Sequence, residues 1–492
     1  MKKNYLLSIM LLTCFYVYAQ PHLEPVSLDL PKKTEKPIEA FAIESGGYIS
    51  YVHEKILKID ENLTSVTGFP YEYLDDYWFV KYYDNKEEVL SFYTKKEKKQ
   101  DVQSLYVCKF KKDGSNYAFN PKKIFSQVIE NKDAVKRFIA KSEDGSKITF
   151  SFVVTDKKKI FKGLRTVVMD QNGNILWDVV TQPQFNNKTF YMDDVQVSNA
   201  GEVYFCVRAH EDNGRGSSAT NERLHLLIIT ENGLEMIDEV VDFGNIKDMN
   251  MKILSNGNVF IAGYYAKTLK DEPCGSFSTM YNSNQNSFSA ITHIDMKDQI
   301  AGKINSKFNI VNRGFYELSN GNIVFIGEEI SSIYYSPSQG TAYYIHALKD
   351  VFIHTYNSAG EEISTQKLEK DQATVQPYSG VNNRNIFGSS IRCFQVRDDI
   401  YIIYNDHVDN VAGELESPKK IAYAIEISYS IAGNSCTVLA KISQGEEITK
   451  NVINIADETN LTFQNVLCHN DESALLFFTK KKGADVFRKL IW

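Results

Sequence analysis

Short apolar runs and short polar turns alternate along most of this chain. β-branched and aromatic residues predominate within the runs, where apolar and polar positions often alternate. This period-two pattern is typical of β-strands that bury one face. One complete unit has strands expected at Val135–Lys141, Ile148–Val154, Leu164–Met169 and Ile175–Val180. Its turns, Glu143–Ser146 and Asp170–Asn174, contain the Asp, Asn and Gly residues that favour tight hairpins. We therefore predict units of four antiparallel strands.

A single phrase occurs twice in the middle of the chain. Leu254–Gly263 reads LSNGNVFIAG, and Leu318–Gly327 reads LSNGNIVFIG. Each copy combines an Asn-Gly turn, where positive φ costs little, with a strongly apolar strand. A phrase that returns at an interval along the chain is typical of a repeat architecture.

The same succession of strands and turns can be followed through eight units. The central hairpins of the first two units are weaker and fall near Ser45–Tyr51 and Glu88–Tyr93. In unit seven we expect strands at Ile391–Val396, Ile400–Tyr404 and Ala422–Ile427. Four-stranded antiparallel sheets repeated around a ring form a β-propeller. The prediction is an all-β propeller of eight blades, with seven blades or a run of separate β-sandwiches as alternatives.

The last unit stops one strand short. Its strands are expected at Leu461–Leu467, Ala474–Phe478 and Val486–Trp492, and no fourth strand follows. Near the other end of the chain, Val26–Leu30 alternates apolar and polar residues. We predict that this N-terminal strand pairs with the C-terminal blade and closes the ring, which removes the exposed edges of an open array.

These segments resemble secreted bacterial β-propellers of unknown function over nearly the whole mature chain. The resemblance rests on the turn-plus-apolar-strand phrase, which is common among propellers. The blades lack the Gly-His and Trp-Asp dipeptides of WD repeats, and Ser142–Ser146 approaches a sialidase Asp-box with its glycine out of place. The resemblance implies an architecture and no particular activity.

The N-terminus has the features of a secretory signal peptide. Lys2 and Lys3 precede an apolar run, Tyr5–Tyr18, that is too short to span a bilayer. A small-residue cleavage pattern ends at Ala19. The alternative is a lipoprotein modified at Cys14, although the residues before it fit a lipobox poorly.

We therefore expect residues 1–19 to be removed and residues 20–492 to form a single propeller domain. The later sequence has no stretch suited to a membrane helix, so the expected location is the periplasm, the cell surface or the medium. Loss of the two lysines changes the formal net charge from -7 to -9. This acidity argues against a nucleic-acid partner, which requires a basic surface.

Six cysteines remain after cleavage, and none belongs to a C-x-x-C pair. Export permits disulfides, and the sequence does not determine their connectivity. Cys108, Cys206 and Cys393 lie inside strand-like runs, which favours buried free thiols at these three positions.

Long insertions are expected on one face of the disc only. If strands are numbered outward from the channel, the tight turns join strands one and two or three and four. The long segments join strands two and three or connect blades, and both of these connections lie on the opposite face. They are His210–Glu222, Lys267–Ser287, Glu329–Ala342, Asp371–Gly388 and His407–Lys419. Long loops on a rigid scaffold commonly carry binding sites.

Aromatic and charged residues in and beside these insertions are the candidate ligand contacts. The candidates are Tyr281, Tyr334, Tyr335, Tyr378, Arg384 and Phe387 in the insertions, and Asp193, Asp194 and Arg392 at the start of innermost strands. Tyrosine offers a large contact area and a hydroxyl group, and its ring can stack on a sugar or a peptide. The alternatives are that the rings pack the loops against their own blades and that the charges form local salt bridges.

Sequence signatures of catalysis and metal binding are weak. The chain has no G-x-S-x-G or H-E-x-x-H motif. Asp406-His407 would point to opposite faces of a strand, and Asp170–Asn174 is better explained as a hairpin turn than as a calcium loop. We therefore expect no metal site and no cofactor.

The sequence favours an exported, non-catalytic propeller that binds an envelope protein or a glycan through its long-loop face. A carbohydrate-active enzyme, a glycosidase or lyase that uses channel carboxylates, is the alternative. A purely structural role in a surface assembly is a third hypothesis.

Overall fold

The computed structural model describes most of the chain after the expected signal peptide. The described residues are 21–29, 39–43, 47–52, 55–70, 76–85, 87–97, 102–113, 118–129, 133–155, 161–183, 189–210, 222–268, 270–297, 299–300, 308–335, 343–377, 390–411, 421–424, 435–443, 448–455, 461–480 and 486–492. The predicted signal peptide, residues 1–19, lies outside them.

The described strands all belong to eight sheets, each of which contains one blade, and we number the blades along the chain. Blade one contains β2 (Glu39–Ala42), β3 (Tyr48–Val52), β4 (Lys55–Ile59) and β5 (Val66–Pro70), and blade two contains β6 (Tyr77–Asp84), β7 (Glu88–Glu97), β8 (Val102–Lys111) and β9 (Lys122–Val128). Blade three contains β10 (Ala134–Lys141), β11 (Lys147–Thr155), β12 (Phe161–Asp170) and β13 (Ile175–Thr181). Blade four contains β14 (Thr189–Val197), β15 (Val203–His210), β16 (Glu222–Thr230) and β17 (Gly233–Val241).

Blade five contains β18 (Asn245–Ile253), β19 (Val259–Ala266), β20 (Gly275–Asn282) and a split fourth strand, β21 (Ser287–Phe288) and β22 (Thr292–Asp295). Blade six contains β23 (Phe308–Glu317), β24 (Ile323–Tyr335), β25 (Tyr343–Tyr356) and β26 (Glu362–Leu368), and blade seven contains β28 (Arg392–Val396), β29 (Asp399–His407), β31 (Ser435–Ser443) and β32 (Ile448–Ile455). Blade eight contains β33 (Leu461–His469), β34 (Ser473–Lys480), β35 (Val486–Ile491) and β1 (His22–Asp29).

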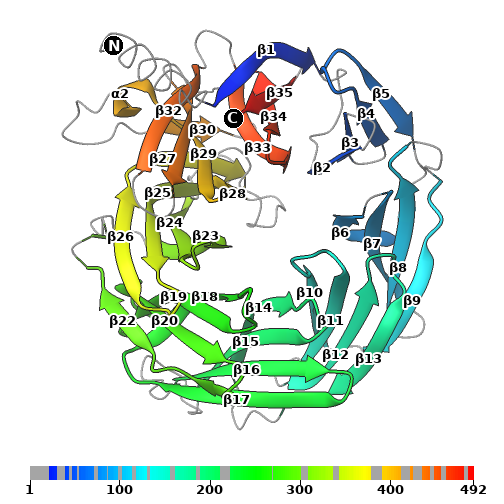
Figure 1. The fold of residues 1–492 in the computed structure, drawn as a ribbon, viewed down its shortest axis with the longest axis vertical. Coiled ribbons are helices and arrows are strands. Elements are labelled where there is room, and N and C mark those ends of the chain that lie inside the picture. Colours follow the sequence, from blue (N-terminus) through cyan, green and yellow to red (C-terminus); the bar gives the residue numbers. More distant parts are fainter. Residues whose placement is uncertain are drawn as a thin grey trace, which may run out of the picture.

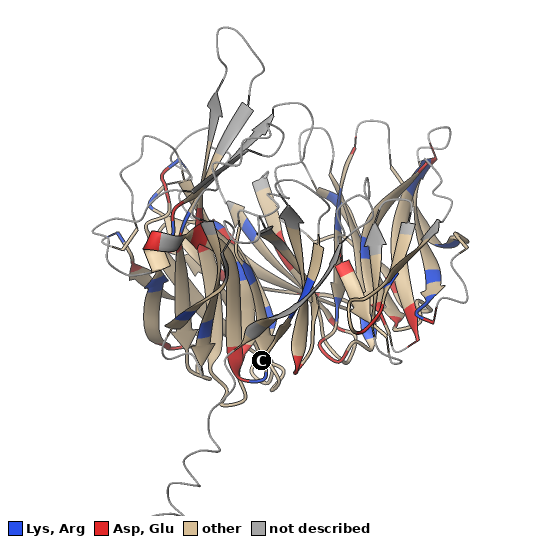
Figure 2. Ribbon diagram, turned by 90° about the horizontal axis from the view of Figure 1, so that it is seen from above, with Lys and Arg blue, Asp and Glu red and all other residues tan. Residues whose placement is uncertain are grey.

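The blades are arranged in a ring (Figure 1), and the first strand of each blade lies nearest the central axis. Seen from the side, they lie at one level and form a disc, with acidic and basic positions interspersed across the blades (Figure 2). The chain is therefore an eight-bladed β-propeller, which confirms the predicted fold class. The seven-blade alternative is wrong.

Hydrophobic packing between neighbouring blades forms the core. Eight clusters of buried side chains lie between successive blades around the ring. One of them joins Leu57 and Ile59 of blade one to Leu475 and Phe477 of blade eight. A blade that is apolar on both faces needs a neighbour on each side, so the arrangement around a ring buries both faces of every sheet.

The duplicated phrase explains one set of contacts between blades. Gly257 and Gly321 adopt φ values of 85° and 80°, which a glycine accepts without strain. The serine of each turn then meets a carboxylate of the next blade. Ser255 donates through its N–H and its hydroxyl to Glu317, and Ser319 does the same to Asp398, at 2.6–2.8 Å. The phrase therefore supplies both a hairpin turn and a contact between blades.

The N-terminal strand takes the fourth position in blade eight. β1 pairs antiparallel with β35, with Leu28 opposite Phe487 and His22 opposite Ile491. Leu23 packs beside the cluster between blades seven and eight, which includes Phe394. The pairing lies where the sequence placed it, and its contribution to holding the ring closed stays a prediction.

Blade seven departs from the expected order. Its third strand is β31, whereas the sequence interpretation had assigned this position to Ala422–Ile427. The described part of that segment, β30 (Ile421–Ala424), instead pairs in parallel with β27 (Gln372–Pro377) outside the blade. Both segments are apolar enough to be strands, so the local pattern did not distinguish the blade strand from the additional one.

A small additional sheet is continuous with blade six, and we call it the sheet extension. β24 and β25 run past the blade as a long hairpin, in which Tyr335 lies opposite Tyr343. β27 pairs with the far part of β25, and β30 pairs with β27. Residues predicted as loop insertions thus form strands, because long hairpin strands satisfy their backbone groups in each other.

All six described cysteines are free thiols. Cys108 and Cys206 are buried, as predicted, whereas Cys393 is half-buried. Burial raises the pKa of the Cys108 thiol to about 11, so this thiol is protonated and unreactive at neutral pH.

Removal of the N-terminal strand should destabilise the propeller. A chain that begins at Pro31 exposes the edge of β35 and loses the packing of Leu23. We expect its unfolding midpoint to fall by on the order of 5 °C relative to a chain that begins at Gln20. Scanning calorimetry measures the difference, and equal midpoints for the two chains would show that β1 does not hold the ring closed.

Candidate functional site

The innermost strands present open edges to the central channel. Each has a partner strand on one side only, so alternate backbone groups must find other partners. Side chains of the preceding blade supply them. At Met251 of β18, the N–H donates to Asp194 Oδ2 at 3.1 Å and the carbonyl accepts from Gln196 Nε2 at 3.0 Å. At Phe463 of β33, the single amide of Asn405 binds both groups, at 3.2 and 2.8 Å.

Charged side chains do the same at two other positions. The N–H of Ile246 donates to Glu222 Oε2 at 2.5 Å, and its carbonyl accepts from the guanidinium of Arg208. The N–H of Asn312 donates to Asp248 Oδ2 at 3.0 Å. The carboxylates of blades four and five therefore hold the inner strands of successive blades together.

Burial shifts the titration of these carboxyl groups. It raises the pKa of Asp194 and of Asp248 to about 6 and that of Glu222 to about 7, although each accepts a backbone N–H. Removal from water penalises the charged form more than these hydrogen bonds favour it. Perturbed carboxyls of this kind occur in active sites and in structural networks alike.

The predicted residues Asp193 and Asp194 lie in the middle of β14 rather than at its start. A bulge between Met192 and Asp194 alters the strict alternation of side chains. Asp193 forms a bidentate ion pair with Arg208, at 2.9 and 3.2 Å, and Asp194 binds the neighbouring strand. The salt-bridge interpretation thus describes the contacts of Asp193.

A second group of charges surrounds Glu328 between blades six and seven. Glu328 is fully buried and accepts hydrogen bonds from Lys370 Nζ at 2.6 Å, Arg313 Nε at 2.7 Å, Ser390 Oγ at 2.6 Å and the N–H of Ile391 at 3.3 Å. The two basic neighbours hold its pKa below the ordinary value in spite of its burial. Lys370 follows β26 and precedes β27, so this carboxylate also anchors the base of the sheet extension.

The predicted residue Arg392 begins β28 beside this group. Its Nε donates to Asn465 Oδ1 at 2.9 Å, and one terminal nitrogen donates to the carbonyl of Ile391 at 3.1 Å. Burial and the nearby Arg313 lower its pKa. Arg392 therefore starts an innermost strand, as the sequence predicted, and its contact with a ligand stays a prediction.

An open cavity of 590 Å³ adjoins the channel side of blades three and four. Val135, Lys136, Arg137 and Phe138 of β10 line it together with Asp193. The sequence interpretation missed five charged residues that form contacts around the inner strands: Arg208, Glu222, Asp248, Arg313 and Glu328. Asp194 and Asp248 each follow a bulge and bind the next inner strand in the same manner, but a bulge is a feature of the folded strands and left no signal in the sequence.

The tyrosine candidates do not form one described cluster. Tyr281 lies on β20, is 4% exposed and donates to Asn286 Oδ1 at 2.9 Å. It is opposite Val259, which directly follows a tight turn, so its expected place in a long-loop insertion is wrong. The insertion of blade five ends before β20, because apolar residues there continue the blade.

The other insertion residues are only partly described. Tyr334 and Tyr335 end β24 in the sheet extension, and their side chains lie outside the description. Tyr378, Arg384 and Phe387 lie outside the described residues altogether.

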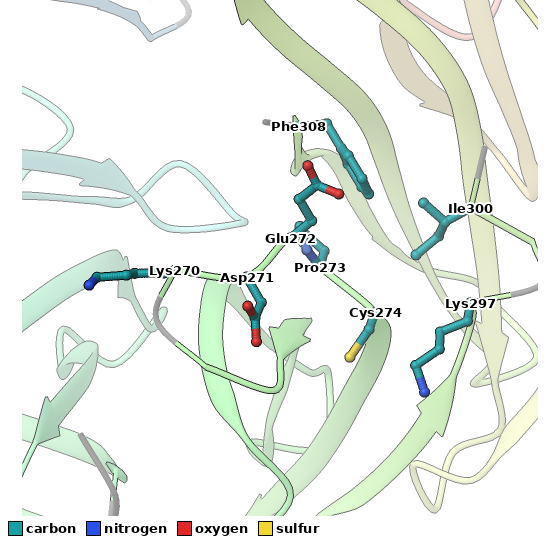
Figure 3. Close-up of a pocket in the computed structure, with 8 residues that line it drawn as sticks. All are labelled: Lys270, Asp271, Glu272, Pro273, Cys274, Lys297, Ile300 and Phe308. Carbon is teal, nitrogen blue, oxygen red and sulfur yellow. The ribbon is translucent and has the colours of Figure 1, made fainter. Parts of the chain in front are cut away.

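A pocket of 490 Å³ is formed on the long-loop face between blades five and six (Figure 3). Lys270, Asp271, Glu272, Pro273 and Cys274 come from the connection between β19 and β20, and Lys297, Ile300 and Phe308 come from the connection to blade six. The two segments are tied by a hydrogen bond from the N–H of Met296 to the carbonyl of Cys274, at 2.8 Å.

The pocket combines both signs of charge with an apolar wall. Lys297 donates to Asp295 at 2.6 Å and keeps about half of its side chain exposed. Burial raises the pKa of the Cys274 thiol, so this group is not a nucleophile at neutral pH. Concave sites with apolar walls and a few polar groups are typical of ligand binding.

Among the described residues, no group of three or more His, Cys, Asp or Glu side chains is arranged to hold a metal ion. In the described part of the chain, no helix has both the length and the apolar character that crossing a membrane requires.

Comparison with known proteins yields fold relatives only. No family model and no curated protein matches the sequence. Among solved structures, the polysaccharide lyase Uly1 has a TM-score of 0.37 and 12% identity, over 83% of this chain and 89% of its own.

A protein of unknown function from Dyadobacter fermentans DSM 18053 also has a TM-score of 0.37 and 12% identity, over 75% and 94% of the two chains. The β-propeller domain of the Trilobed protease from Pyrococcus furiosus has a TM-score of 0.34 and 9% identity, over 85% and 94%. At these values the relatives carry no argument about activity.

Charge removal at Asp248 should change how stability depends on pH. The carboxyl has a pKa near 6 in the folded chain and an ordinary value of 3.8. The folded protein therefore holds this proton more tightly, and the contribution of Asp248 to stability falls as pH rises from about 4 to 6. Asp248→Asn keeps an oxygen for the N–H of Asn312 and removes the titration.

We expect the free energy of unfolding of Asp248→Asn, taken relative to that of wild type, to increase by about 1 to 3 kcal/mol as the pH is raised from 4.5 to 7. Urea unfolding at the two pH values measures it. A relative stability that is constant across this range would mean that the carboxyl titrates normally.

Proposed function

We propose that this protein is exported and acts as a non-catalytic binding scaffold, which holds an envelope protein or a glycan on its long-loop face. The observation that carries the proposal is the pocket between blades five and six, where two connections of that face supply charged and apolar side chains to one concavity. The sheet extension of blade six arises from the same face. A rigid disc with long connecting segments on one face is suited to presenting a binding surface.

The use of the channel carboxylates supports a non-catalytic role. Asp194, Asp248 and Glu222 accept backbone hydrogen bonds that join blades, and Asp193 is held by Arg208. A hydrolase needs carboxyl groups free to reach the scissile bond. Groups engaged in blade contacts would have to break those contacts to act on a substrate.

Substitution of the two pocket lysines should weaken partner capture. We expect Lys270→Ala combined with Lys297→Ala to lower the captured amount about tenfold, because two exposed cationic contacts are lost. The mature chain serves as bait for envelope extract and, separately, as probe on a glycan array. The unfolding midpoint should stay within about 2 °C of wild type, since both side chains reach solvent.

Lys252→Ala is the matched control. Lys252 precedes the tight turn of blade five on the opposite face and pairs with Glu143 at 3.3 Å. It should capture the same partners as wild type. Equal capture by the pocket variant and wild type, or loss of capture in the control alone, would refute the proposed face.

The three tyrosines of the blade-six insertions offer a separate test. Replacing Tyr334, Tyr335 and Tyr378 with alanine should abolish capture and leave thermal unfolding nearly unchanged if the rings contact a partner. A large drop in the unfolding midpoint would instead assign the rings to packing within the fold.

One observation favours the alternative of a carbohydrate-active enzyme. The pKa of Glu222 is raised to about 7, a value suited to a general acid. Glycans that bind on the array can be incubated with the mature chain and examined for new reducing ends or unsaturated products. Turnover that disappears in Glu222→Gln would support this alternative over the scaffold.

A further inference from the structure

Two arginines at the channel wall, Arg313 and Arg392, are bonded differently from Arg208 and Arg165. Arg208 uses all three guanidinium nitrogens, two on Asp193 and one on the carbonyl of Ile246. Arg165 also uses all three, two on Asp178 and one on the carbonyl of Ser126. These arginines have no nitrogen left for a ligand.

Arg313 and Arg392 retain unused donors. Arg313, on β23, donates only through Nε to Glu328, so both of its terminal nitrogens are without a partner among the described residues. Arg392, on β28, donates through Nε and one terminal nitrogen, and its other terminal nitrogen has no described partner. A guanidinium carries five N–H donors, so several of them are unfilled at this wall.

The pairing of Arg392 is electrostatically weak. Its described partners are the amide oxygen of Asn465 and a backbone carbonyl, both neutral. Glu328, a carboxylate that attracts Arg392, already accepts from Lys370 and Arg313. Burying a guanidinium that lacks an anionic partner costs free energy, and a bound anion would offset that cost.

Other charges act on the two arginines without bonding to them. Asp248 attracts Arg313, but its Oδ2 accepts the N–H of Asn312. Arg313 and Arg392 repel each other, which contributes to the lowered pKa of Arg392. Two neighbouring guanidinium groups that repel each other are stabilised when an anion lies between them.

Both arginines keep part of their side chains exposed. Arg313 exposes 23% of its side chain, and Arg392 is half-buried. Both lie on innermost strands, β23 and β28, which neighbour each other around the axis (Figure 1). A planar carboxylate or a sulfate matches the fork geometry of guanidinium donors.

We propose that Arg313 and Arg392 form a binding site in the channel wall for the carboxylate or sulfate group of an acidic ligand. The inference deepens the proposed function by naming a ligand class, and it rests on that function only in so far as the anion belongs to the captured partner. Direct binding of small anions tests the site without any captured partner.

The experiment is calorimetric titration of the mature chain at constant ionic strength. The probes are trigalacturonate, its methyl ester and inorganic sulfate. We expect trigalacturonate to bind and its uncharged ester to bind at least about tenfold more weakly, because the ester loses the charge-assisted hydrogen bonds. Arg313→Gln and Arg392→Gln should each weaken trigalacturonate binding about tenfold or more.

Matched variants separate binding from folding. Arg223→Gln removes a guanidinium from β16, where it pairs with Asp238 away from the inner strands, and should bind as wild type does. Arg392→Lys keeps the charge and loses the fork, so it should fold and bind more weakly than wild type. Circular dichroism and the unfolding midpoint verify the fold of each variant.

The outcomes decide the proposal and the source of the anion. Binding of sulfate alone, lost in the two arginine variants, supports the site and assigns it to sulfate. Equal affinity of trigalacturonate and its ester, unchanged affinity in both arginine variants, or binding of neither anion would overturn the proposal. Failure of partner capture with intact anion binding would count against the proposed face only.

Discussion

The open edges of the inner strands impose the constraint on which this propeller depends. Every blade ends at the channel in a strand with one neighbour, and its remaining backbone groups need partners. The chain satisfies several of them with side chains from the preceding blade. Asp194 and Gln196 bind both groups of Met251, and Asn405 does the same at Phe463. Hydrophobic packing brings the blades together, and these polar contacts fix how neighbouring inner strands lie.

This constraint has a consequence for function. The carboxylates of the channel wall in blades four and five are occupied by backbone groups and by Arg208. Charged groups that are exposed or have unused hydrogen-bond donors lie elsewhere, in the pocket of the long-loop face and at Arg313 and Arg392. We therefore propose that structural contacts and ligand contacts are made by different residues of the chain.

Much of the architecture could be predicted from local patterns. The duplicated phrase beginning at Leu254 and Leu318 identifies repeated hairpins, and the alternation at Val26–Leu30 locates a strand that does pair with β35. Such features depend on residues close together in the sequence. The same is true of Arg392, whose position at the start of an inner strand follows from the strand pattern.

The errors arose where the outcome depends on distant partners. Tyr281 is of a residue type that is common in binding loops, yet its position opposite Val259 on β20 buries it beside a tight turn. Ala422–Ile427 resembles a blade strand, and only its pairing with β27 reveals the sheet extension. Asp248, Glu222 and Arg313 escaped prediction because an isolated charge gives no sign of which backbone group or ion it will meet.

The most direct test of the central claim is hydrogen exchange at single backbone amides of the inner strands. Electron-transfer fragmentation in mass spectrometry can resolve the N–H groups of Met251 and Asn312, which donate to Asp194 and Asp248. If these carboxylates hold the blades together, both amides exchange as slowly as the paired amides of β19 and β24. Exchange as fast as in exposed turns would show that the channel carboxylates are free, and would contradict the account.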